Sequence, residues 1–178
     1  KLAELQEQLT QAEQKNQRAL SMAQQTRTGH VYVISNIGSF GEHVLKIGMT
    51  RRLEPLDRIK ELGDASVPFE FDVHAMIFSE DAPALEKALH KHFLRTQINK
   101  VNPRKEFFRI PLNLVQAEIE ALGHKAHWTI TSLAREYRES LVIEQEIQSD
   151  PLKRQEWLHT QIDAVDADTS EEPAEGIE

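Results

Sequence analysis

The alternation of apolar and polar positions changes twice along the chain and predicts three regions. In residues 1–27, which contain no Gly or Pro, apolar side chains recur at spacings of three and four, at Leu2, Leu5, Leu9 and Ala12. This narrow seam predicts an exposed helix of the coiled-coil type. Three heptads are too few to establish pairing, so homo-oligomerisation through residues 1–27 is an expectation only.

The centre of the chain has the pattern of a small α+β domain. Runs of β-branched and aromatic residues predict strands at 30–36, 44–49, 69–79 and 106–110. Helical periodicity predicts helices at 53–63 and 79–97, the second capped by Ser79 or Asp81. Its buried stripe is expected to contain Leu85, Ala88, Leu89, His92 and Phe93. The first two strands indicate an antiparallel hairpin, and the whole order predicts a small mixed sheet flanked by helices.

Beyond Pro111 the pattern becomes helical again. Apolar periodicity predicts helices at 112–123, 131–148 and 151–162. Residues 163–178 are acidic and nearly free of apolar side chains, so we expect a disordered tail there. The expected organisation is a helical extension at 1–27, a central domain at 28–111, C-terminal helices at 112–162 and the tail at 163–178.

The charge is unevenly distributed. The chain carries a net charge of −8, but residues 29–110 hold 12 basic and 11 acidic groups, and the flanks hold 9 and 18. Residues 46–60 contain five basic and two acidic groups, and residues 87–109 contain seven and one. Both stretches could meet a phosphate backbone, although solvated helix faces would look the same in charge alone.

Composition excludes several classes of protein. Cysteine is absent, which rules out disulfides and Cys-based zinc sites or nucleophiles and favours the cytoplasm. No run of about 18 apolar residues is present, so we expect no membrane span and no membrane contact in this chain. Because Lys1 lies inside a helical pattern, we expect the chain to be part of a longer protein, and inner-membrane association through an upstream region is left open.

Five short motifs occur in a fixed order in the centre. They are "HVYVI", "LKIGMT", "RIKEL", "ALEKALHKHF" and "KEFFRI". In this order and spacing they resemble the GIY-YIG nuclease superfamily, and more narrowly its phage-type branch, in which Lys-Ile-Gly replaces Tyr-Ile-Gly. The resemblance covers residues 17–110. Such proteins carry an upstream coiled-coil-rich region, and some are linked to anti-phage defence.

The resemblance implies a role for each of five residues. Tyr32 would activate or position the attacking water, and Lys46 replaces the second tyrosine of the family. Arg58 would steady the scissile phosphate. Glu86 would hold a single divalent cation, Mg²⁺ or Mn²⁺, and His90 lies one turn further along the same helix.

The chemistry of these residue types is compatible with phosphodiester hydrolysis. One Mg²⁺ on a single carboxylate keeps most of its waters, and an Arg presents planar, permanently charged donors to phosphate oxygens. Tyr has a pKa near ~10, and a neighbouring cation lowers it. Lys46 is a candidate for that cation, or it grips phosphate directly. Glu86 and His90, at i and i+4, share one helix face.

Each residue also has an ordinary structural explanation. Tyr32 fits a half-buried strand aromatic, and Lys46 fits an edge-strand lysine. Arg58 could pair with a Glu on its own helix, and Glu86 with His90 could be an exposed pair. For Glu106, a supporting role in the site and a strand-edge role are equally consistent with the sequence.

Two functions therefore follow from the resemblance. The first is a metal-dependent DNA endonuclease in bacterial defence against phage DNA, and the second is a catalytically inactive DNA-binding module of the same fold. Both predict contact with the phosphate backbone of double-stranded DNA. The exposed cations expected to make it are Arg51, Arg52, Lys60, Lys91, Arg104 and Lys105.

Overall fold

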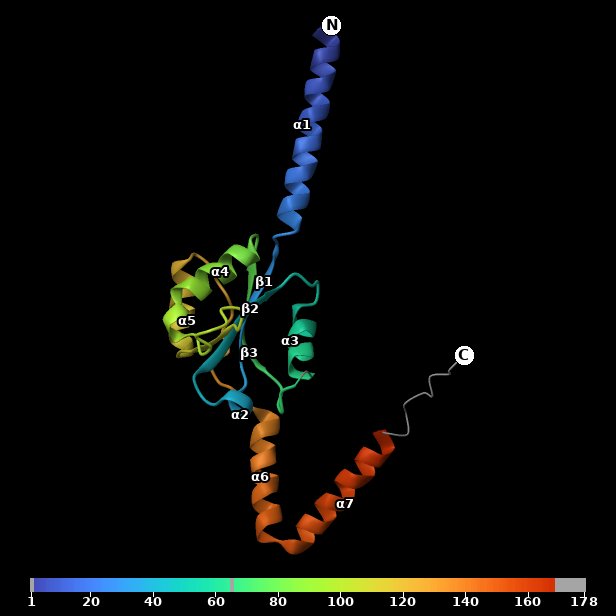
Figure 1. The fold of residues 1–178 in the computed structure, drawn as a ribbon, viewed down its shortest axis with the longest axis vertical. Coiled ribbons are helices and arrows are strands. Elements are labelled where there is room, and N and C mark those ends of the chain that lie inside the picture. Colours follow the sequence, from blue (N-terminus) through green and yellow to red (C-terminus); the bar gives the residue numbers. More distant parts are fainter. Residues whose placement is uncertain (1, 65, 169–178) are drawn as a thin grey trace, which may run out of the picture. The chain divides into compact units, whose positions relative to one another are not determined.

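The protein contains one four-stranded sheet in a computed structural model that describes residues 2–64 and 66–168 (Figure 1). The strand order is β3-β1-β2-β4, with bounds β1 Gly29–Ser35, β2 Val44–Thr50, β3 Asp72–Ser79 and β4 Phe107–Arg109. The α+β class expected from the sequence is confirmed. All three pairings are antiparallel, however, so the strand directions are not mixed.

Helices precede, interrupt and follow the sheet. Their bounds are α1 Leu2–Gln25, α2 Ile37–Phe40, α3 Pro55–Asp64, α4 Ala82–His92, α5 Leu112–Ala121, α6 Arg135–Ser149 and α7 Pro151–Asp168, with a 3-10 turn at Leu94–Thr96. The described residues fall into two compact units, one within Lys1–Ala134 and the other within Arg135–Glu178. None of the described helices is long and apolar enough to cross a bilayer.

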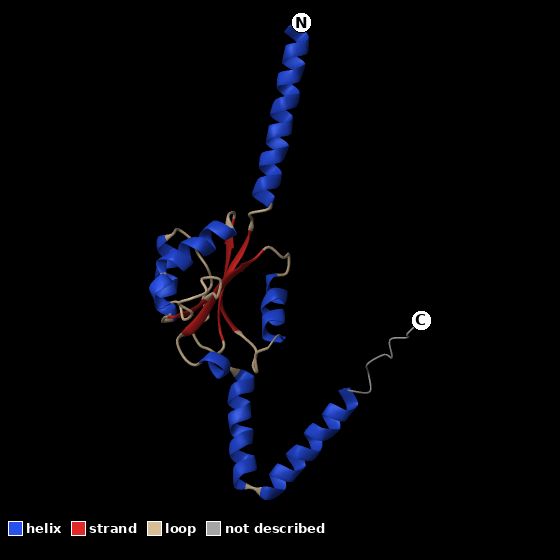
Figure 2. Ribbon diagram, viewed as in Figure 1, coloured by secondary structure: helices blue, strands red, loops and turns tan. Residues whose placement is uncertain are grey.

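The two faces of the sheet are covered by different helices (Figure 2). Strand side chains alternate between faces, so one face presents residues such as Val33 and Ile47 to α4 and α5. The other presents Tyr32 and Ile34, which pack with Ile59 of α3. The helix α5 contributes Val115 and Ile119 to the first cluster and so belongs to the same core as the sheet.

The helix α4 is fixed at its start and along one face. Asp81 is its N-cap and accepts a hydrogen bond from the Ala84 N–H at 3.1 Å. The buried stripe consists of Ala82, Leu85, Leu89 and Phe93. The expectation that His92 lies in this stripe is wrong, because the spacing of the other four turns it outward, where its Nδ1 lies 3.3 Å from Glu118 Oε1.

The C-terminal unit is a pair of helices. Its helix α7 runs to Asp168, so the expectation of disorder from residue 163 is wrong for residues 163–168. His159 and Asp163, at i and i+4, approach to 2.9 Å, and the alanines at 164 and 167 favour continued helix. The remainder of the expected tail, residues 169–178, lies outside the described residues.

Candidate active site

The site forms where the last strand stops early. β4 pairs only with Val44, Leu45 and Lys46 of β2. Beyond them, the backbone groups of β2 that point away from β1 need other partners. The Ile47 N–H donates to the Glu106 carbonyl at 3.1 Å, and the Ile47 carbonyl accepts from His90 Nε2 at 2.7 Å. These two hydrogen bonds hold α4, through His90, and the segment before β4, through Glu106, at the open edge of β2.

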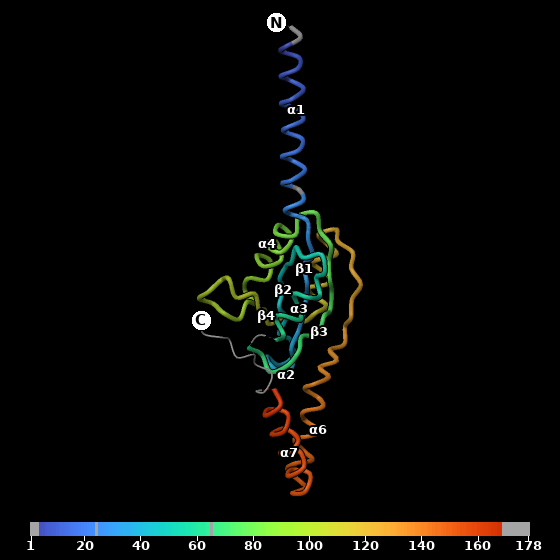
Figure 3. The backbone as a smooth tube through the Cα atoms, turned by 90° about the vertical axis from the view of Figure 1, so that its right-hand side faces the viewer, coloured from blue at the N-terminus to red at the C-terminus, as the bar shows by residue number. Residues whose placement is uncertain are grey.

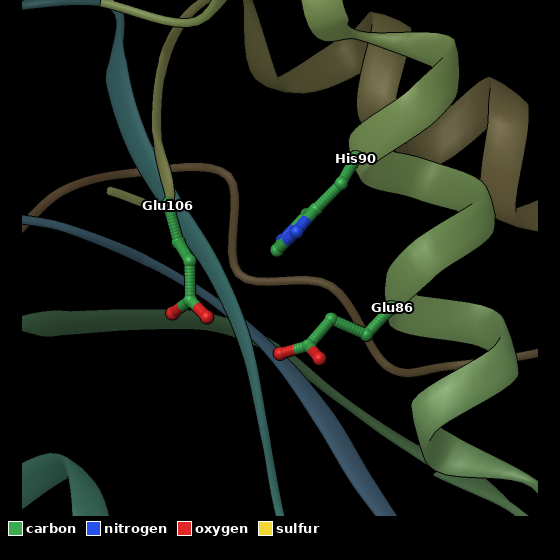
Figure 4. A group of neighbouring side chains, drawn as sticks. All are labelled: Glu86, His90 and Glu106. Atoms are coloured by element: carbon green, nitrogen blue, oxygen red, sulfur yellow. The ribbon is translucent and has the colours of Figure 1, made fainter. Parts of the chain in front are cut away.

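Three potential metal ligands converge at this edge (Figure 4). Glu86 and His90 come from one face of α4, and Glu106 comes from the segment that leads into β4. Ligand atoms of all three lie within 4.8 Å of one another. The expectation that Glu86 and His90 point at one site is confirmed. Glu106 lies in the same cluster, which favours the supporting role in the site over the strand-edge role.

The protonation of this cluster follows from its surroundings. Burial and then the negative charge of Glu106 raise the pKa of Glu86, whose value is about 7. Lys46 and a hydrogen bond from the Met49 backbone act in the opposite direction. Because a carbonyl oxygen only accepts, the contact with Ile47 places a proton on His90 Nε2 and leaves Nδ1 as the lone-pair nitrogen of the neutral ring.

Lys46 is held inside the fold by an ion pair. Its side chain is 11% exposed, and Nζ lies 2.5 Å from Glu106 Oε2. The same Nζ lies 5.3 Å from the ring centroid of Phe107 and 6.0 Å from that of Tyr32. An edge-strand lysine that extends into solvent is therefore excluded.

Tyr32 lies across the second motif. It is 2% exposed and is the register partner of Gly48. A Cβ at position 48 would lie 2.4 Å from the phenol oxygen and 2.6 Å from the ring carbon that carries it. The glycine of "KIG" is therefore what leaves room for the phenol.

The charge balance around Tyr32 differs from the sequence-based expectation. Burial, helped by the carboxylates of Glu106 and Glu86, raises the pKa of Tyr32 to about 12. Arg58 is the cation that lowers it, partly through a side-chain hydrogen bond. Lys46, the cation suggested by the sequence, is paired with Glu106, and Arg58 takes the role of the cation beside the phenol.

Arg58 has two partners. Besides acting on the phenol of Tyr32, its guanidinium lies 3.6 Å from Glu61 on the same helix, and Glu61 also forms an ion pair with Arg52. The ordinary helix pair and the site contact therefore coexist. With its side chain 41% exposed, Arg58 retains donors that a phosphate can reach.

The six cations expected to bind DNA are all exposed. Arg51 and Arg52 follow β2, Lys60 lies on α3, Lys91 lies on α4, and Arg104 and Lys105 precede β4. Arg51 donates to the Thr26 carbonyl at 2.8 Å. They belong to four different segments of the fold, and their contact with DNA stays a prediction.

Sequence reasoning missed the backbone and steric parts of the site. The Ile47 carbonyl, the Met49 N–H and the missing Cβ of Gly48 carry no side-chain signal. The sequence predicts a strand at 106–110, whereas β4 spans only Phe107–Arg109, so the unpaired part of β2 appears only in the structure.

Comparison with known proteins identifies the family of this domain. A model of the T5orf172 domain matches residues 29–123, which run from β1 through α5 and include Tyr32, Lys46, Arg58, Glu86 and Glu106. The curated proteins and the solved structures give no match. The matched segment is 95 of 178 residues, more than half of the chain. The chain therefore belongs to the T5orf172 domain family.

Proposed function

We propose that this protein is a divalent-metal-dependent DNA endonuclease, related to GIY-YIG nucleases, that hydrolyses phosphodiester bonds. The observation that carries the proposal is the convergence of a phenol, a guanidinium and a carboxylate cluster at the open edge of β2. The charge of Arg58 lowers the pKa of Tyr32, and the charges of Glu106 and Glu86 raise it, so all three groups act on the same phenol. These groups come from positions 32 to 106, so no single local element explains their proximity.

The residues fit a hard divalent cation. Two carboxylates and an imidazole with ligand atoms within 4.8 Å match the oxygen-rich surroundings of Mg²⁺ and Mn²⁺. The raised pKa of Glu86 reflects repulsion from Glu106 and loss of water, and both costs fall when a cation lies between the two groups. Glu86 would be the principal ligand, because one oxygen of Glu106 already binds Lys46. A bound Mg²⁺ or Mn²⁺ supplies charge relief to the phosphate and the leaving oxygen.

The chain's own residues would divide the remaining tasks. Arg58 would bind a non-bridging phosphate oxygen with donors that its contacts with Tyr32 and Glu61 leave available. With a pKa of about 12, Tyr32 carries its proton at neutral pH and would orient a water molecule. Since Glu106 and Glu86 help to raise that pKa, neutralising these carboxylates would lower it and increase the fraction of phenolate, the form that can accept a proton.

Lys46 and His90 would act by positioning. The Lys46 ammonium fixes the carboxylate of Glu106 beside the cluster at 2.5 Å. The hydrogen bond from His90 to the Ile47 carbonyl holds α4 against β2 and so would position Glu86, one turn earlier on α4, relative to the strand. We also propose double-stranded DNA as the partner, the cytoplasm as the location and defence against phage DNA as the setting; these follow from the resemblance and the exposed cations.

A plasmid assay tests the proposal. Purified protein is incubated with supercoiled plasmid and Mg²⁺, Mn²⁺ or EDTA. Nicked or linear product with either metal and none with EDTA is expected. Intact plasmid under every metal condition would contradict the nuclease assignment.

One observation favours a second candidate, a DNA-binding module without catalysis. The position of the family's second tyrosine holds a lysine that is neutralised by Glu106 rather than free to act on Tyr32. The same assay separates the two functions, because a binding module would retard the plasmid in a gel, with strong salt dependence, and leave it intact.

A further inference from the structure

The segment between α4 and β4 stands out from the body of the fold (Figure 3, yellow-green). We call residues 94–105 the basic loop. It carries four cations, Arg95, Lys100, Arg104 and Lys105, and all of them are exposed. No acidic residue occurs between positions 87 and 105. In a chain with a net charge of −8, this loop is therefore a local concentration of positive charge.

The basic loop is held in one shape by its own polar side chains. Asn99 Oδ1 accepts from the Val101 N–H at 3.0 Å and the Asn102 N–H at 2.9 Å, and Asn102 Oδ1 accepts from the Arg104 N–H at 3.0 Å. These contacts are Asx turns, which fix a loop without a regular element. Binding through such a loop costs less ordering entropy than binding through a floppy one.

A buried glutamine ties the two arms of the loop together. Gln97 is 5% exposed, and its Nε2 donates to the carbonyls of Lys105 at 2.7 Å and Pro103 at 3.2 Å. At the base, the Ile98 N–H donates to the Phe107 carbonyl at 2.9 Å. Since Glu106 follows Lys105 directly, the loop is joined to the candidate active site by a short, hydrogen-bonded connection.

The tip of the loop carries one apolar side chain. Val101 is 92% exposed and lies between Lys100 and Asn102, whereas the exposed side chains of Leu94 and Ile98 lie nearer the base. One apolar side chain among cations suits the minor groove of a duplex, where phosphates edge the groove, sugars line its walls and base edges form its floor. Deoxyribose offers the tip an apolar surface, whereas the shallow groove of duplex RNA displays 2′-hydroxyl groups that an apolar side chain would desolvate.

We propose that the basic loop is a preformed grip for duplex DNA. Lys100, Arg104 and Lys105 contact phosphates, and Val101 enters a groove and favours deoxyribose over ribose. The grip lies at a fixed separation from Glu106 and so sets which phosphate reaches the site. The inference rests on the proposed function for its substrate class, but it concerns binding and not cleavage.

The test compares two variants of the full chain with equal loss of charge. The loop variant is Lys100→Gln/Arg104→Gln/Lys105→Gln, and the control is Lys15→Gln/Arg18→Gln/Lys125→Gln, whose positions lie outside the basic loop and the site. Affinity for a labelled DNA duplex is measured by fluorescence anisotropy in EDTA, between 50 and 200 mM salt. EDTA keeps the DNA intact, so the measurement does not depend on catalysis.

Binding by the loop variant is expected to weaken at least tenfold at low salt, while the control changes less than about threefold. The slope of log affinity against log salt should fall by about 0.9 for each lost phosphate contact. Equal loss in both variants, or no loss in the loop variant, would overturn the inference. Wild-type protein that binds through the loop but never cuts would overturn the proposed nuclease and leave the grip standing.

The preference of the basic loop for DNA over RNA is tested by a separate binding measurement. Wild-type protein is expected to bind the DNA duplex several-fold more tightly than an RNA duplex of the same sequence, and Val101→Asn should reduce that ratio. An RNA duplex bound as tightly as DNA, or a ratio that Val101→Asn leaves unchanged, would contradict the role of the tip.

Discussion

At the scale of single residues, the site depends as much on a missing atom as on the groups present. The phenol of Tyr32 occupies the space where a side chain at position 48 would begin. This gives the glycine of the second motif a steric role in the site, beside the conformational freedom usually invoked for glycine.

Gly48→Ala is expected to displace the phenol and impair the site. The added Cβ would lie 2.4 Å from the Tyr32 oxygen, and the ring cannot yield freely because it is buried. Overpacking of this kind costs about 1–3 kcal/mol of folding free energy. Urea denaturation measures that cost, and a plasmid assay measures the loss of cleavage.

Gly63→Ala provides the control. It lies within α3, where a Cβ would meet its nearest neighbour at 3.6 Å, an ordinary contact. Alanine there should leave cleavage unchanged and stabilise the helix by roughly 0.5–1 kcal/mol. Equal behaviour of the two variants would show that position 48 has no special steric role.

Lys46→Met is expected to shift the pH dependence of cleavage toward higher pH. Lys46 lowers the pKa of Glu86, whose value is already about 7, and Glu86 must be ionised to hold a cation. Removing the ammonium therefore raises the pKa of Glu86, so Glu86 ionises only at a higher pH. Cleavage rates of both proteins between pH 6 and 9 measure the shift, and superimposable profiles would return Lys46 to a purely structural role.

At the scale of elements, the site exists because β4 is shorter than β2. The expected strands and helices at the centre of the chain were readable, since alternation and helical spacing determine which faces are apolar. Convergence of Glu86 and His90 followed from their i, i+4 spacing. The free edge of β2 was not readable, because strand length depends on pairing between distant segments.

The exposed apolar side chains of α1 predict that the chain forms an oligomer. Leu5, Leu9, Leu20 and Met22 are exposed on a helix of 24 residues. Such apolar side chains are buried when helices pair, so the whole chain is expected to form an oligomer whose mass decreases when residues 1–27 are removed. Light scattering of both proteins measures this, and an identical monomeric mass would contradict pairing through α1.

In the whole molecule, the features on which the proposed function rests all lie in the unit within Lys1–Ala134. That unit contains the sheet, the site and the basic loop, and it includes the segment that matches the T5orf172 domain. In the described part of the second unit, residues 135–168, no side chain is buried. The ion pair of Lys46 with Glu106 and the high pKa of Tyr32 were beyond the sequence, because both depend on burial and on charges brought together by folding.

If Glu86 holds the cation on which cleavage depends, removing its carboxylate should abolish cleavage, whereas removing a neighbouring carboxylate should not. Glu86→Ala is compared with Glu80→Ala, which removes an exposed carboxylate just before the same helix. Loss of several kcal/mol of transition-state stabilisation predicts that Glu86→Ala cuts plasmid more than about a hundredfold more slowly in Mg²⁺ or Mn²⁺. Its affinity for DNA in EDTA should persist, and Glu80→Ala should cut normally. Undiminished cutting by Glu86→Ala would contradict the account.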